Sequence, residues 1–199
     1  SHLLGLNISH RTSTEMGTQR NVELDIPITL THERMEYMRG QTDTIGCRNY
    51  TIIYPRLSYE SIWNEELCSF RASTSFLTTA ADFLQLMPFV DNRNPLMVRE
   101  NNPNLKQSWI YSVETSLSMR SRSSSQLLSI NASANIYGNQ IANGFTFNPT
   151  TGVYTYRPEN VNGNWDIKGG IDYSLPFGKE QCFKLENKAS GSFMHAVDM

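Results

Sequence analysis

The side chains that most often perform catalysis or bind metals are few and scattered in this 199-residue chain. The nearest set is His32, Glu33 and Glu36, but these positions alternate poorly as one face of a strand, so we interpret them as a charged strand end. The remaining histidines stand apart, at His2, His10 and His195. No metalloprotease, serine-hydrolase or phosphate-binding glycine motif occurs. We therefore predict a protein that is not an enzyme and needs no cofactor.

A second candidate site is a stretch rich in carboxylate and amide oxygens, the ligands that calcium prefers. Its members are Asp91, Asn92, Asn94, Glu100 and Asn102. They lack the regular ligand spacing of a known calcium loop, so we predict no bound metal.

Three cysteines, Cys47, Cys68 and Cys182, match no zinc or redox spacing, and an odd number cannot fully pair. A disulfide between Cys47 and Cys68 is one alternative in an oxidising compartment, and three unrelated thiols is the other.

Composition excludes some classes of protein. The net charge is −2 and Lys and Arg are scattered, so we expect no nucleic-acid partner. No apolar run approaches the length of a membrane-spanning helix and the mean hydropathy is −0.43, which leaves open a membrane surface built on alternate residues of strands. The chain opens with SHLLGLNISH, so we expect any signal peptide to lie outside it.

The elements that must position these side chains are strands, because apolar and polar residues alternate with a period of two. The clearest strands are 22–30, 109–119, 128–136, 165–175 and 180–193. Weaker candidates are 3–10, 50–54, 57–63, 67–75, 141–147 and 153–156. Short turns between consecutive strands predict an antiparallel meander. Pro27 cannot donate to a ladder and predicts a bulge or a strand end.

Aromatic spacing tests whether these strands could cross a membrane, where aromatic girdles flank an apolar band about 25 Å tall. Trp165 and Tyr173 share a face of one strand and span roughly 21 Å along the membrane normal. Phe183 and Phe193 span about 26 Å by the same estimate. Alternation alone fits a soluble β-sandwich equally well.

One long segment, residues 76–107, carries no strand pattern, and we expect an extended surface loop there with a helical turn within TTAADFLQLMP. Within it, LQLMPFVDNRNPL and NNPNLK resemble a loop of the outer-membrane β-barrel proteins of Bacteroidetes, which are TonB-dependent receptor-like. GVYTYRPENVNGNWDIKGGIDYSLPF, residues 152–177, is similar to a later hairpin of that family, and IPITL and PRLSYE extend the likeness over most of the chain. Asn101 and Gln107 depart from the usual Gly and Pro.

The resemblance implies a fold and a function. The fold is all-β, an antiparallel meander forming part of a large transmembrane barrel, and nine to twelve strand candidates are too few for the family's roughly 22. The resemblance also implies nutrient uptake, with a glycan, a peptide or a metal chelate as cargo. The expected partners are outer-membrane lipid, a TonB complex reached through other parts of the protein, and a surface lipoprotein.

The resemblance assigns the two faces of the strands. Polar residues that would line the lumen are Glu114, Asp166, Lys168 and Asp172, for which a hydrated wall is favoured over a ligand site. Aromatic residues that would form membrane girdles are Trp109, Tyr111, Trp165, Tyr173, Phe183 and Phe193.

Three alternatives stay open. The first is an outer-membrane β protein that serves adhesion or envelope assembly without transport. The second is a soluble sandwich that binds carbohydrate through Trp63, Trp109 and Trp165, although the latter two share faces with aliphatic residues. The third is a barrel enzyme with catalytic side chains at its rim, which missing soluble-enzyme motifs do not exclude.

Overall fold

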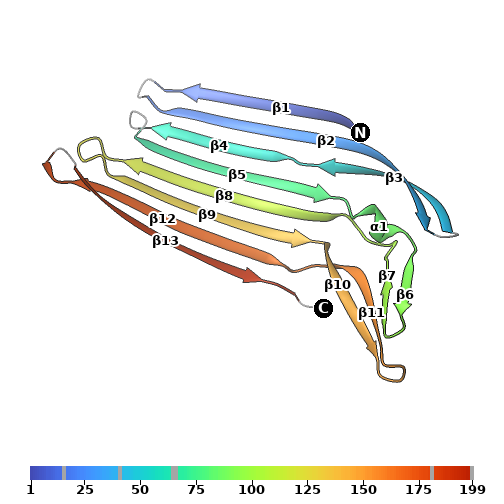
Figure 1. Ribbon diagram of the computed structural model, residues 1–199. Helices are drawn as coiled ribbons and strands as arrows, with labels where there is room; N and C mark the ends of the chain where they lie inside the picture. Colours follow the sequence, from blue (N-terminus) through green and yellow to red (C-terminus); the bar gives the residue numbers. More distant parts are fainter. Residues whose placement is uncertain (15–16, 40–41, 64–66, 180–181, 198–199) are drawn as a thin grey trace.

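The computed structural model describes residues 1–14, 17–39, 42–63, 67–179 and 182–197 (Figure 1). Most of them form β-strands. The strands are β1 (His2–Ser13), β2 (Gln19–Arg39), β3 (Thr42–Ile53), β4 (Arg56–Trp63), β5 (Cys68–Thr79), β6 (Val90–Asn94), β7 (Met97–Glu100), β8 (Ser108–Arg120), β9 (Leu127–Gly138), β10 (Gln140–Asn148), β11 (Val153–Val161), β12 (Trp165–Phe177) and β13 (Phe183–His195). A single helical turn, α1 (Phe83–Leu86), interrupts the described strands, and no described helix is long and apolar enough to cross a membrane.

Two sheets are present. The large sheet has nine strands in the order β1-β2-β4-β5-β8-β9-β12-β13, with β3 pairing the far half of β2. Every pairing in it is antiparallel. Most join strands that follow one another along the chain, but β2 also meets β4 beyond β3, and β5 meets β8 and β9 meets β12 across long insertions. Those insertions build the loop sheet, a four-stranded sheet in the order β10-β11-β7-β6. The antiparallel meander predicted from the alternating pattern is thus confirmed for the large sheet.

The two prolines of the N-terminal strands lie at one break in the ladder. Pro27 lies within β2 opposite Gly5 of β1, while β3 ends at Ile53 and β4 begins at Arg56 in the same register along β2. Neither Pro27 nor Pro55 can donate, but both still accept, from Tyr54 N at 3.1 Å and from Phe76 N at 3.0 Å. The interruption predicted for Pro27 therefore falls on its partner strand, and β2 continues unbroken.

The two ends of the large sheet differ. Figure 1 shows the short connections β1–β2, β4–β5, β8–β9 and β12–β13 gathered at one end. The opposite end carries the extended β2–β3 hairpin, α1 and the loop sheet. Short turns at one end and long loops at the other are typical of outer-membrane barrels, whose long loops face outward.

Several expectations from the sequence need correction. The strand predicted at 22–30 runs on to Arg39, and the predicted loop contains β6 and β7 as well as the expected helical turn. Of the predicted strand 180–193, residues 180–181 lie outside the described residues and β13 begins at Phe183. Cys47 and Cys68 are free thiols, because they lie on different strands that are not paired side by side, so the disulfide alternative is wrong.

Candidate functional site

The register of the large sheet aligns polar side chains in rows that cross the sheet from β1 to β13, past every strand except β3. Residues directly opposite in neighbouring strands point to the same face of a sheet. One such row reads Ser9, Glu23, Ser58, Ser73, Glu114, Ser133, Lys168 and Ser192 from β1 to β13. This polar face continues in the flanking row through Arg11, Asn21, Glu60, Arg71, Ser116 and Asn131.

The opposite face is apolar and aromatic. Leu6 and Ile26 lie on this face of β1 and β2, and a row of Phe76, Tyr111, Ile136 and Trp165 continues it from β5 to β12. All six aromatic residues predicted as girdles, Trp109, Tyr111, Trp165, Tyr173, Phe183 and Phe193, share this apolar face. Their rings are partnered along it: Trp165 lies 5.3 Å from Phe193 and Phe177 lies 5.5 Å from Phe183, centroid to centroid.

Trp109 depends on a glycine for its place on the apolar face. It lies opposite Gly138, and a Cβ on that glycine would come within 2.0 Å of the indole ring. The indole therefore covers bare backbone of β9 at the point where the chain leaves the large sheet. The indole can pack here only because residue 138 is a glycine and has no side chain.

A hollow of about 510 Å³ opens on the polar face over the middle strands. Charged residues that line it are Glu23, Arg56, Glu60, Arg71 and Glu114. Arg71 Nε donates to Glu60 Oε1 at 2.6 Å, and Asn7 Nδ2 donates to Glu23 Oε1 at 3.0 Å. The predicted lumen residue Glu114 is exposed in this hollow, whereas Lys168 and Asp172 extend the same face on β12.

Asp166 differs from those three residues because it is 5% exposed. Tyr137 Oη donates to its Oδ1 at 2.5 Å and Asn135 Nδ2 to its Oδ2 at 2.9 Å, while Lys168 Nζ lies 3.5 Å from Oδ2. Ser112 Oγ in turn donates to Asn135. The carboxylate is thus held by its neighbours, and these hydrogen bonds connect β8, β9 and β12 next to the loop sheet.

The two motifs that carry the family resemblance bind one another at the loop end. Asn102, buried, donates to Pro158 O at 2.9 Å and accepts from Arg157 Nη2 at 3.0 Å. Asn160 accepts from Lys106 N at 2.8 Å and donates to the carbonyl oxygens of Lys106 and Asn139.

Further asparagines close the corners around this junction. Asn139 has a φ of 51°, a left-handed conformation that Asn tolerates, and its N–H donates to Asn162 Oδ1 at 2.7 Å. Parallel pairing of Tyr154 with Met97 joins the two loops a second time. The long loops therefore form one body, a contact that the asparagine-rich motifs alone did not reveal.

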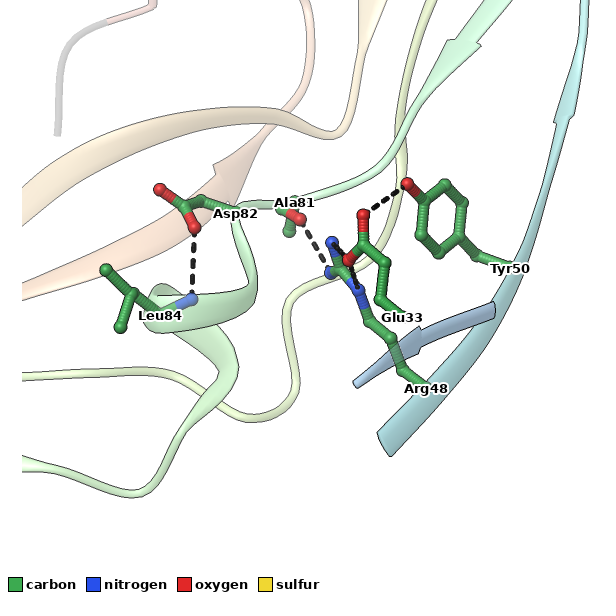
Figure 2. Close-up of polar contacts among 6 residues, drawn as sticks. All are labelled: Glu33, Arg48, Tyr50, Ala81, Asp82 and Leu84. Atoms are coloured by element: carbon green, nitrogen blue, oxygen red, sulfur yellow. Dashed lines mark hydrogen bonds and ion pairs between the residues drawn. The ribbon is translucent and has the colours of Figure 1, made fainter. Parts of the chain in front are cut away.

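A second junction, the clamp, holds the β2–β3 hairpin to the segment before α1 (Figure 2). Arg48 Nε donates to Glu33 Oε2 at 2.8 Å, Arg48 Nη1 to Ala81 O at 2.6 Å, and Tyr50 Oη to Glu33 Oε1 at 2.7 Å. The Arg48 guanidinium also lies over the rings of Tyr50 and Phe83, at 4.7 and 5.0 Å.

Two further features seat α1 in the clamp. Phe83 is buried against Gly46 of β3, where a Cβ would come within 2.7 Å of the ring. The Asp82 carboxylate accepts from Leu84 N at 3.0 Å and caps the helical turn. The hairpin and the helical turn are therefore fitted to each other.

The clamp changes the acidity of its members, which lie beyond the end of the neighbouring strand β5. Hydrogen bonds from Tyr50 and then Arg48 hold the pKa of Glu33 below its ordinary value. The hydrogen bond to Glu33, followed by burial, raises the pKa of Tyr50. The lowered pKa favours the ionised Glu33 that pairs with Arg48, and the raised pKa favours the protonated Tyr50 that donates to Glu33.

The candidate metal sites do not assemble. Glu33 belongs to the clamp, His32 is hydrogen-bonded to Asn49, and Glu36 is paired with the exposed Arg34. Asp91 is held by Arg93 in the loop sheet. Among the residues that the structure describes, no group of three or more His, Cys, Asp or Glu side chains could hold a metal ion.

Comparison with protein families agrees with this two-faced sheet. A family described as the outer membrane protein beta-barrel family matches residues 30–197. The chain belongs to this family. It is accordingly an outer-membrane β-barrel protein, located in the bacterial outer membrane, and its antiparallel meander forms part of a large transmembrane barrel that is open between β1 and β13 in this structure.

A solved structure has a similar fold. The chain is similar in fold to the siderophore receptor PirA from Pseudomonas aeruginosa, with a TM-score of 0.53 and 13% sequence identity. The match covers 96% of this chain and 42% of that receptor, so the chain spans less than half the length of the protein it matches. A comparison with curated proteins found no match.

Proposed function

We propose that this chain is part of the barrel wall of a TonB-dependent, receptor-like protein that takes up a nutrient. The observation that carries the proposal is the row from Ser9 to Ser192, which keeps one face of the large sheet polar across eight strands, β1, β2, β4, β5, β8, β9, β12 and β13. A membrane barrel presents such a polar face to its interior, and a barrel that encloses water requires it. The likeness in fold to a siderophore receptor supports a wide barrel.

In this proposal the apolar face contacts lipid and the aromatic girdles sit at the two membrane interfaces. Trp109, Tyr111 and Trp165 lie toward the loop end, and Tyr173 and Phe183 lie toward the short-turn end. Energy would come from a TonB complex that contacts other parts of the protein.

The polar face would then line the lumen. Glu114, Lys168 and Asp172 would form its hydrated wall, while Asp166 would brace the wall under the outer loops. The charged hollow over Arg71 and Glu114 mixes both signs of charge, which suits contact with water and with a polar occupant of the barrel.

The test is energy-dependent accumulation by cells that express the complete gene. Labelled probes of three classes, an iron chelate, a peptide and an oligosaccharide, are offered with and without a protonophore. We expect one class to accumulate only when the protein is present and only while the membrane is energised. Protein that reaches the outer membrane in normal amount, yet accumulates none of the three, would contradict uptake and favour a role in adhesion.

A matched pair of variants connects uptake to the polar face. Glu114→Leu is expected to reduce accumulation at unchanged surface abundance, since it makes the hydrated face apolar. Val113→Leu, the adjacent residue on the apolar face and outside the hollow, is expected to leave accumulation unchanged. Equal effects of the two would mean that the polar face has no part in passage.

A further inference from the structure

Four aromatic rings gather on one face of the loop sheet, and we name them the aromatic strip: Phe145, Phe147, Tyr154 and Tyr156. Phe145 lies opposite Tyr156 and Phe147 opposite Tyr154. Ring centroids are 4.6 Å apart for Phe147 and Tyr154 and 6.1 Å apart for Phe145 and Tyr156. Phe145 is nevertheless 55% exposed and Phe147 49%, so the rings pack on one another and still present flat surface to solvent.

Charged side chains continue this face onto the next strands. In the parallel pairing of β11 with β7, Tyr154 lies beside Met97 and Tyr156 beside Arg99. Arg99 then lies opposite Asp91, which is paired with Arg93. The face is thus aromatic at β10 and β11 and charged at β7 and β6.

Arg99 is the cation that lies directly beside the aromatic strip, next to Tyr156. It is exposed and lines an open hollow of about 430 Å³ with Asp91, Arg93 and Met97. Within the part of the chain that the structure describes, no hydrogen bond or ion pair holds its guanidinium. With Asp91 and Arg93 offsetting each other, the hollow keeps a net positive charge.

We propose that the aromatic strip and Arg99 bind an acidic oligosaccharide, a chain of sugar rings that carries carboxylates. The flat C–H faces of sugar rings would stack on the exposed aromatic rings, and the Arg99 guanidinium would pair with a sugar carboxylate through its two parallel N–H groups. Tyr154 and Tyr156 would add hydroxyl groups at the edge of the stack.

Charge and position select this ligand over other polymers. A lipid surface would be met by apolar side chains without the ionic rim at Asp91, Arg93 and Arg99. A peptide strand is usually bound at the edge of a sheet through its backbone, whereas the features here lie on the face. Rings two residues apart on a strand are separated by about 7 Å, so the strip is large enough for more than one flat sugar ring.

The inference rests on the proposed function only in one respect, that the loop end faces the outside of the cell. Binding by the chain in detergent micelles requires no energy and no passage through a barrel, so it can fail while uptake stands, and uptake can fail while binding stands.

The experiment is calorimetric titration of the chain, folded in detergent micelles, with tetragalacturonate. We expect saturable binding that Arg99→Gln weakens at least tenfold, Arg99→Lys weakens less, and Phe147→Ala weakens several-fold. Neutral maltotetraose is expected to bind more weakly and to be insensitive to Arg99→Gln. Matched controls at the short-turn end, Arg11→Gln and Phe177→Ala, should bind as the unaltered chain does.

Each variant is first shown by circular dichroism to keep its β content, so that lost binding reports the site and not the fold. No saturable binding of tetragalacturonate by the folded, unaltered chain would overturn the proposal. Binding by Arg99→Gln and by Phe147→Ala that is as tight as binding by the unaltered chain would also overturn it. Tetraglutamate that binds as tightly as tetragalacturonate would show that charge alone acts and that the aromatic strip has no role.

Discussion

The large sheet and the loop sheet are held together in different ways. Strands of the large sheet are paired in an unbroken register from β1 to β13, and alternation alone separates its polar and apolar faces. The loop sheet has only four strands and depends on side-chain bonds from Asn102 and Asn160 to backbone groups of the other loop. The large sheet is therefore specified by the different solvents that its two faces contact. The loop sheet is specified by polar contacts between particular side chains and backbone groups.

The largest effect should come from placing a charge on the apolar face of the large sheet. Ala134→Arg, between Val113 and Ile167, is expected to lower the free energy of unfolding in lipid by about 2 kcal/mol or more. Ser133→Arg, one residue away and between Glu114 and Lys168, should cost less than about 1 kcal/mol. Urea unfolding in lipid vesicles measures both. Equal losses of unfolding free energy in the two variants would show that the two faces do not contact different solvents.

The next effect concerns the corner where the large sheet meets the loop sheet. Gly138→Val would drive its side chain into the Trp109 indole and should cost about 1–3 kcal/mol. Gly169→Val, on the same face with only ordinary contacts nearby, should cost much less. In a Trp109→Ala background the cost of Gly138→Val should shrink. If it does not, the packing explanation is wrong.

The loop sheet should respond to the loss of one buried amide. Asn102→Ala leaves Pro158 O and Arg157 without a partner and should destabilise the loop junction by about 1–3 kcal/mol. Limited proteolysis should then cut both long loops faster, while the large sheet keeps its unfolding midpoint. Asn104→Ala removes an exposed side chain from the same motif and is the control. A lowered midpoint for the whole chain would mean that the two sheets are one cooperative unit.

The smallest effect is the pH response of the clamp. Because the pKa of Glu33 is lowered in the folded state, its contribution is present above the ordinary carboxyl pKa, about 4.3, and is lost as the pH falls through the lowered value. Because the pKa of Tyr50 is raised, its contribution is lost only as the pH rises through that raised value, above about 10.

Hydrogen exchange at amides around Phe83, corrected for intrinsic rates, should show this acid loss. Tyr50→Phe should reduce it, and Glu36→Gln on the same hairpin should leave it unchanged. An acid response that survives Glu33→Gln would show that another group is responsible.

Period-two alternation predicted most of the large sheet. Each strand alternates polar and apolar residues along its own sequence, because its two faces contact different solvents, so no knowledge of its partner strands is needed. The same parity placed Glu114, Lys168 and the six girdle candidates on opposite faces. The far half of β2 was missed, since its charged residues such as Glu33 are placed by partners on β3 and not by a buried face.

The loop sheet could not be predicted in the same way. β6 and β7 are short and carry no alternation. β7 pairs with β11 across more than fifty residues of sequence, and β6 pairs with β7. Asp166 was expected among the hydrated residues, and only the structure reveals that Tyr137 and Asn135 enclose it. Asparagine-rich motifs such as NNPNLK do signal such contacts, but they do not name the partner.

The account's central claim is that the apolar face of the large sheet contacts lipid, and tryptophan fluorescence tests it most directly. Trp63, Trp109 and Trp165 all lie on that face, Trp63 toward the short-turn end and the other two toward the loop end. Single-tryptophan variants are refolded into vesicles whose lipids carry bromine at known depths. The account predicts strong quenching of all three at interfacial depth, whereas a soluble β protein without quenching at any depth would contradict it.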